Sequence, residues 1–115
     1  MISKPVFLQG IHDVVGTGVH KPALLHPSLT YKVPPGITTQ PLYFRGGNAT
    51  DELLTVVLAR DGLPMRYFPI GAKGAVHVQL AVVEDLEEGT VLELQLAAPD
   101  GLTGTVVVDL GLVEV

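Results

Sequence analysis

Four side chains on two separate candidate strands are of the kind that bind a small polar ligand. Tyr43 and Arg45 alternate with apolar residues on one strand, and His77 and Gln79 do the same on the other. Residues two apart on a strand point to the same face, so neighbouring strands would set all four side by side on an outer surface. Aromatic and planar polar groups of this kind can bind a sugar or a carboxylate. One hypothesis is therefore a small-ligand or carbohydrate-binding module.

No arrangement of residues in the sequence indicates catalysis or a metal site. His12, His20 and His26 are eight and six residues apart, which matches no compact zinc or copper ligand pattern. The only serines, Ser3 and Ser28, stand outside any nucleophile elbow, and the lack of cysteine excludes thiolate chemistry. Paired carboxylates occur at predicted turns, where solvation opposes the displaced pKa values of general acids and bases. We therefore predict a non-enzymatic protein with no metal or other cofactor.

The composition and net charge of the chain disfavour two classes of binding partner, nucleic acids and anionic membranes. Apolar residues make up 47% of the 115 residues and charged residues 17%, whereas the usual charged share is about 25%. The net charge of −5 and the scattered basic residues disfavour a nucleic acid or an anionic membrane as partner. The N-terminus lacks a signal-peptide pattern, and no apolar run reaches transmembrane length. We therefore expect a cytoplasmic or particle-borne protein.

Strand signals recur at regular intervals from Leu29 onward. Each candidate strand alternates apolar and polar residues and ends at turn-forming residues. Asp61-Gly62 is typical of a tight β-hairpin, and Pro64 and Pro69 place the strand between them at a sheet edge. Seven strands result, over 29–33, 38–45, 52–60, 65–68, 75–83, 90–98 and 105–115.

The regular spacing of these strands predicts an all-β fold. The expected architecture is a two-sheet antiparallel Greek-key sandwich of the immunoglobulin and fibronectin-III-like kind, and the alternative is a jelly roll or small barrel. The last two strands carry matching apolar rows on either side of Pro99-Asp100-Gly101, which predicts an antiparallel hairpin. The acidic passage 86–90, which leads into a strand ending at Ala97-Ala98, resembles a corner of fibronectin-type-III-like sandwiches. That resemblance implies the same sandwich fold.

Residues 1–27 read differently from the remainder. They hold three of the four histidines together with Pro5, Pro22 and Pro27, and their apolar runs are short. Pro22 and Pro27 exclude a good helix over residues 19–28. We expect residues 1–27 to form an extended N-terminal arm with one short strand, followed by a β-sandwich domain over residues 28–115.

Two strands, 52–60 and 105–115, are apolar on both faces. If both flank strand 90–98 in one sheet, their outer faces form a single surface, which usually marks an interface. That surface would carry Leu53, Thr55, Val57, Glu93, Gln95, Val107, Asp109 and Val113. The leading hypothesis is therefore a non-enzymatic subunit that forms a homo-oligomer or docks into a larger protein assembly, such as a shell or virion. The arm could instead cover this face within one chain.

Overall fold

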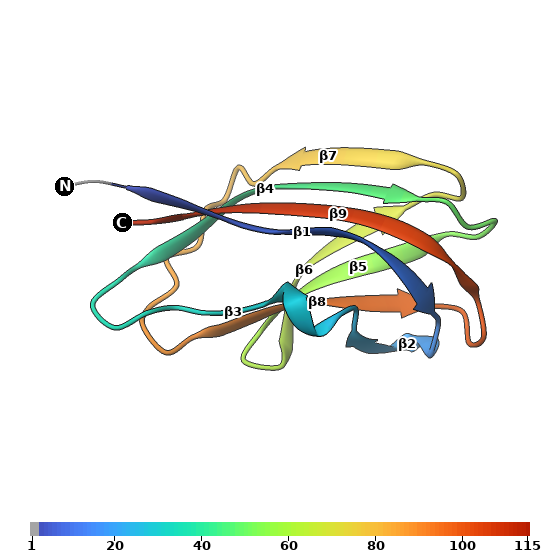
Figure 1. The fold of residues 1–115 in the computed structure, drawn as a ribbon, viewed down its shortest axis with the longest axis horizontal. Helices are drawn as coiled ribbons and strands as arrows, with labels where there is room; N and C mark the ends of the chain where they lie inside the picture. Colours follow the sequence, from blue (N-terminus) through green and yellow to red (C-terminus); the bar gives the residue numbers. More distant parts are fainter. Residues whose placement is uncertain (1–2) are drawn as a thin grey trace.

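Two antiparallel β-sheets packed face to face make up the protein (Figure 1). The structure is a computed structural model, and it describes residues 3–115. The described part is elongated, with extents of 45 × 23 × 22 Å. Its elements are β1 (Lys4–Val15), β2 (Gly18–Leu24), the 3₁₀ helix η1 (Pro27–Leu29), β3 (Thr30–Lys32), β4 (Thr39–Asn48), β5 (Leu54–Arg60), β6 (Leu63–Ile70), β7 (Ala75–Gln79), β8 (Val91–Ala98) and β9 (Thr103–Glu114).

The strands are divided between two sheets. Sheet A has the order β1-β9-β4-β7, and sheet B has the order β2-β8-β5-β6, with β3 also pairing with β8. The predicted all-β, two-sheet sandwich is confirmed. All seven strands predicted from Leu29 onward are present as β3 to β9, because period-two alternation between turn residues marks a half-buried strand.

The core lies between the sheets. Apolar side chains that alternate along each strand turn to the inside, and Leu94 of β8 and Leu110 of β9 are completely buried there. The ring of Phe44 in sheet A stacks on that of Phe68 in sheet B, with centroids 4.3 Å apart. Each such side chain stabilises the fold by about 1.5–3 kcal/mol when it is fully buried.

A hydrogen-bonded tyrosine also links the two sheets. The Tyr31 hydroxyl on β3 donates to Glu114 on β9 at 2.6 Å and lies 2.8 Å from the Thr39 hydroxyl on β4. Burial and the Glu114 carboxylate raise the pKa of Tyr31 to about 12. The phenol therefore remains a donor at neutral pH and satisfies the carboxylate of Glu114, which is buried.

The predicted hairpin between the last two strands is wrong. β8 belongs to sheet B and β9 to sheet A, so residues 99–102 carry the chain from one sheet to the other. The two apolar rows face each other across the core instead of lying side by side. Alternation tells which side of a strand is apolar, but both arrangements bury the same side.

The N-terminal segment also differs from the predicted arm. Residues 4–15 form β1, which pairs with β9 along its whole length, and residues 18–24 form β2, which pairs irregularly with β8. The segment thus contributes one strand to each sheet. Leu8 and Val14 are buried in the core. Met1 and Ile2 lie outside the described residues.

The hairpin predicted at Asp61-Gly62 is confirmed. β5 and β6 pair up to Arg60 and Leu63, which leaves a two-residue loop. Asp61 has φ 51° and Gly62 φ 82°, the left-handed pair that a tight hairpin turn requires. β6 lies at the edge of sheet B, as its two prolines predict.

Two residues predicted to point inward do not. Leu42 is 41% exposed because a bulge shifts the register of β4 between Pro41 and Tyr43. Val82 is 69% exposed because β7 ends at Gln79, so the alternation no longer describes a strand there.

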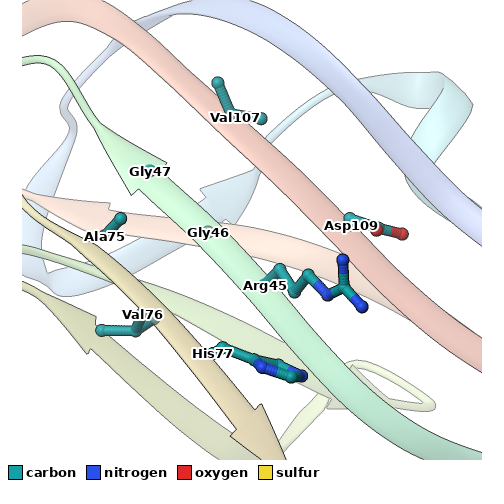
Figure 2. Close-up of a pocket in the computed structure, with 8 residues that line it drawn as sticks. All are labelled: Arg45, Gly46, Gly47, Ala75, Val76, His77, Val107 and Asp109. Atoms are coloured by element: carbon teal, nitrogen blue, oxygen red, sulfur yellow. The ribbon is translucent and has the colours of Figure 1, made fainter.

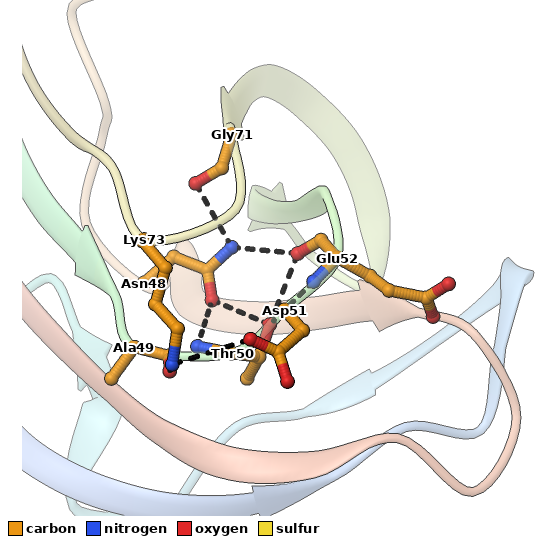
Figure 3. A network of polar contacts seen from close by, with 7 residues as sticks. All are labelled: Asn48, Ala49, Thr50, Asp51, Glu52, Gly71 and Lys73. Atoms are coloured by element: carbon orange, nitrogen blue, oxygen red, sulfur yellow. Dashed lines mark hydrogen bonds and ion pairs between the residues drawn. The ribbon is translucent and has the colours of Figure 1, made fainter.

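A buried asparagine braces the loops that follow β4 and β6 (Figure 3). The Asn48 amide nitrogen donates to the carbonyls of Glu52, Ile70 and Gly71 at 2.8, 3.0 and 3.2 Å. Its oxygen accepts from the backbone N–H and the hydroxyl of Thr50 at 2.9 and 2.7 Å. With 3% exposure, Asn48 is structural, and its Asn-Ala-Thr sequon is not accessible to a glycan in the folded protein.

Candidate functional site on the outer face of sheet A

The outer face of sheet A brings the four predicted ligand-binding residues together. β4 and β7 pair so that Tyr43 lies opposite Gln79 and Arg45 lies opposite His77. On the other side of β4, β9 sets Asp109 opposite Arg45. These five residues, here called the polar cluster, come from three adjacent strands. Their role in binding stays a prediction.

Contacts within the polar cluster hold its side chains in a defined arrangement. The Tyr43 hydroxyl donates to Asp109 at 3.2 Å. The Arg45 guanidinium carbon lies 5.1 Å from the centroid of the Tyr43 ring, within cation–π range. The His77 ring meets the Tyr43 ring edge to face, with centroids 6.2 Å apart. Tyr43 is therefore the centre of the cluster.

A glycine on β9 allows the Tyr43 ring to lie against the sheet. Gly111 is the cross-strand partner of Tyr43. A Cβ atom at Gly111 would come within 1.9 Å of Cε2 of Tyr43, so no other residue fits while the ring keeps this position. Gly111 thus acts as the floor on which the ring rests.

Next to the polar cluster, the face opens into a cavity of about 600 Å³ (Figure 2). Arg45, His77 and Asp109 line one part of it, and the backbone of Gly46 and Gly47 forms part of its floor. The remaining lining residues are apolar: Ala75, Val76 and Val107. A cavity with an apolar part and a few convergent polar groups is typical of a small-molecule site.

The neighbouring strand β1 extends this face with apolar side chains. Phe7 lies opposite Gly111 and Ile11 lies opposite Val107, so cross-strand rows run from β1 through β9 to β4. One row is aromatic, with Phe7 and Tyr43 on either side of Gly111. The next row towards the cavity is polar, with Gln9, Asp109, Arg45 and His77. The face therefore offers apolar and hydrogen-bonding surface side by side.

The polar cluster contains both hydrogen-bond donors and hydrogen-bond acceptors. Burial and the nearby Asp109 carboxylate raise the pKa of Tyr43, so its hydroxyl stays protonated and continues to donate to Asp109. Arg45 and Gln79 supply donors, and Asp109 and Gln79 supply acceptors. Such a mixed set can pair with the hydroxyl groups of a ligand.

Sequence reasoning missed the contribution of β9 to this face. Asp109 was expected on a surface shared with strand 90–98, and Gly111 carried no signal of its own. Both follow only from the pairing of β9 with β4. The alternation of Val107, Asp109 and Gly111 on one side of the strand shows that they share a face, but not which strand lies beside them.

The residues predicted to form one interface lie on two opposite faces. Thr55, Val57 and Gln95 are on the outer face of sheet B, whereas Val107 and Val113 are on the outer face of sheet A. Leu53 precedes β5 and is 59% exposed. The single surface is wrong because β9 joins sheet A and not sheet B, and the role of these residues at an interface stays a prediction.

Part of the predicted interface is covered within the chain. Val57 is only 1% exposed although it points to the outer side of sheet B. It lies in a cavity of about 300 Å³ that Pro22 of β2 and Tyr67 of β6 also line. The strands at both edges of sheet B therefore shield the apolar outer side of β5.

The histidines are dispersed, apart from one pair. The rings of His12 and His26 stack with centroids 4.2 Å apart. Burial, together with the charge of His26, lowers the pKa of His12. His20 lies on the outer face of sheet B and His77 on that of sheet A. Among residues 3–115, no three His, Asp or Glu side chains come together in a group that could hold a metal ion.

Comparison with known proteins shows similarity of fold only. No family model and no curated protein matches the sequence. Among solved structures, the chain is similar to the CBM36-1 domain of a multidomain xylanase from the hindgut metagenome of Trinervitermes trinervoides, with 13% identity, a TM-score of 0.52 and 96% of each chain covered. It is also similar to a family 35 carbohydrate binding module from Clostridium thermocellum, with 15% identity, a TM-score of 0.50 and coverage of 95% of this chain and 97% of that one. Within the described range, the structure contains no helix with the length and apolar character needed to cross a membrane.

Proposed function

We propose that the protein is a non-catalytic carbohydrate-binding module that holds a saccharide on the outer face of sheet A. The observation that carries this proposal is the polar cluster, in which one aromatic ring rests on the sheet among a guanidinium, an imidazole, an amide and a carboxylate. Saccharides present the complementary surface, since their rings have apolar C–H faces and hydroxyl edges. The proposal therefore rests on the match between both kinds of surface.

Tyr43 provides the apolar part of the site. The C–H groups of a pyranose face carry a small positive charge and pack well against the negative face of an aromatic ring. The ring already rests on Gly111, and its hydroxyl is held by Asp109. The ring is thus held in place before binding, which favours affinity. The Arg45 guanidinium, which lies over the ring, has to move aside for a saccharide to stack there.

The polar groups favour hydroxyls over a simple anion. Arg45 alone would attract a carboxylate or phosphate, but Asp109 lies opposite it on the next strand. The negative charge of Asp109 opposes a second anion in the same place. Neutral hydroxyl groups, which both donate and accept, can satisfy Arg45, Asp109 and Gln79 together.

The size of the site and the fold of the chain agree with this function. The cavity beside the polar cluster, at about 600 Å³, falls in the range of about 300–1,000 Å³ that is usual for ligand pockets. Both solved structures compared above are of carbohydrate-binding modules. At 13% and 15% identity they share the fold with this chain, and the polar cluster is what argues for a shared type of ligand.

The assembly hypothesis has less support than the carbohydrate hypothesis. Its predicted surface is divided between the outer faces of two sheets. In addition, Val57, one of its main apolar residues, is already buried within the chain.

The test is a binding screen on the purified protein. Soluble polysaccharides that differ in their backbone sugars are included in native gels. Retardation, the slower migration of the protein in a gel that contains polysaccharide, is measured for the wild type and for Tyr43→Ala. We expect retardation by at least one polysaccharide and a loss of about tenfold or more in affinity for Tyr43→Ala, since a stacked aromatic contributes about 0.5–1.5 kcal/mol in addition to the apolar area that it buries.

Tyr67→Ala is the matched control, because Tyr67 is an exposed tyrosine on the opposite sheet. It should bind like the wild type. Absence of binding to any polysaccharide, or equal losses in the two variants, would contradict the proposal. Tyr43→Phe separates the roles of the ring and the hydroxyl, and it should keep most of the affinity.

A further inference from the structure

β1 presents a long sheet edge. It is an outer strand of sheet A, and among the described residues its only strand partner is β9. It runs for 12 residues in continuous register with β9, without a bulge. The edge of such a strand exposes a row of unpaired N–H and C=O groups, which is a template for another strand.

The other sheet edges carry features that oppose pairing. β6 contains Pro64 and Pro69, β7 has only five residues, and β3 has three. β2 contains Lys21 and Pro22, and its register with β8 is interrupted. Residues 6–12 of β1, in contrast, include no proline, lysine, arginine, aspartate or glutamate. Natural sheets use such residues to block edges, so the unprotected edge of β1 indicates that a partner occupies it.

The sequence of β1 is complementary to itself. In an antiparallel pair of two copies centred on Gln9, position 7 lies opposite position 11, and this contact occurs twice. Phe7 and Ile11 are 50% and 70% exposed and point to the same outer face. The pairing therefore sets an aromatic residue opposite a β-branched one on both sides of the centre, which is a favourable cross-strand combination.

The few charges of β1 do not oppose this pairing. Lys4 and Asp13 are its only Lys, Arg, Asp or Glu residues, and both lie near its ends. When position 9 faces position 9, Lys4 lies opposite Val14 and Asp13 lies opposite Pro5, so no like charges face each other across the two strands.

We propose that β1 pairs antiparallel with β1 of a second copy of this chain, centred on Gln9, and joins two A sheets into one continuous sheet. The twofold axis of this pair is perpendicular to the sheet, so both outer faces point the same way. If the proposed function is correct, two polar clusters then bind one polysaccharide chain together, and the dimer binds it more tightly than one site alone. The dimer itself does not depend on that function.

The test is the solution mass of the full chain by light scattering, over about three decades of concentration up to about 0.5 mM. We expect a reversible dimer. Ile11→Lys places a charge opposite Phe7 of the second copy at both symmetric contacts, and it should raise the dimer dissociation constant on the order of a hundredfold. Val15→Lys is the matched control, since Val15 is 65% exposed on the same strand but lies beyond the paired segment.

A wild type that stays monomeric throughout the concentration range overturns the proposal. So does a dimer that Ile11→Lys leaves intact, or one that Val15→Lys weakens as much as Ile11→Lys does. Polysaccharide retardation of the monomeric Ile11→Lys variant reports separately on the polar cluster.

Discussion

Replacing Asn48 by alanine should destabilise the protein severely although the residue touches no proposed ligand. The side chain makes five hydrogen bonds, and three of them, to Ile70 and twice to Thr50, are buried. Each buried bond contributes about 1 kcal/mol net, and the orphaned partners add a desolvation cost. We therefore expect the free energy of unfolding to fall by about 3–4 kcal/mol.

Urea denaturation followed by circular dichroism measures this loss. With an m-value of about 1.5 kcal/mol/M, the midpoint should fall by about 2 M. Gln40→Ala is the control, since Gln40 makes one exposed hydrogen bond of 2.7 Å from its amide nitrogen to Asp85. Its effect should stay within about 0.5 kcal/mol. If Asn48→Ala costs no more than Gln40→Ala, then the network in Figure 3 does not brace the loops and the reasoning fails.

Asn48→Asp adds a second test of the same network. The substitution keeps the oxygen that accepts from Thr50 but replaces the donating amide by a carboxylate oxygen. That oxygen would face the carbonyls of Glu52, Ile70 and Gly71. We expect a loss at neutral pH at least as large as that of alanine. Part of the stability should return towards about pH 4, where the protonated acid can donate again.

Two further predictions concern the ligand face and the histidine pair. Gly111→Ala should displace the Tyr43 ring and abolish polysaccharide retardation. Gly71→Ala is the control, because its added Cβ would meet no atom within 4 Å and Gly71 lies outside the cavity, so it should keep binding. Equal binding by both variants would contradict the role of the ring. His12 has a lowered pKa in the fold, so the unfolded chain binds a proton more readily below about pH 6.5 and stability should decrease as the pH falls through that value. Urea midpoints at several pH values should show a smaller decrease for His12→Gln than for the wild type, with His20→Gln unchanged from the wild type.

Local patterns in the sequence determine much of this protein. Alternating residues between turn signals locate seven strands, because a strand with one buried face must alternate. Asp61-Gly62 specifies its hairpin through backbone geometry alone. The outward positions of Tyr43 and His77 follow from the same alternation. These features depend only on residues close in sequence.

The sequence does not predict the two N-terminal strands, because neither β1 nor β2 is a compact apolar run. β1 alternates Leu8 with Gln9 and includes Gly10 and His12, and its burial depends on β9, about 100 residues away. Prolines suggested an arm, yet Pro5 and Pro22 lie on edge strands, where the missing N–H is tolerated. The pairing of β1 with β9 stabilises β1 only once the long loop between these distant strands has closed, so residues near β1 in the sequence do not reveal it.

Which strands become neighbours was decided by the tertiary structure alone. The apolar rows of β8 and β9 fit a hairpin or two facing sheets equally well, since either arrangement removes the same side chains from water. The crossing at residues 99–102 sends β9 to sheet A. That choice divides the predicted interface between two faces, and it adds Asp109 and Gly111 to Tyr43 and Arg45. Residues close in sequence set which side chains each strand face carries, and the pairing of distant strands sets which faces combine into a site.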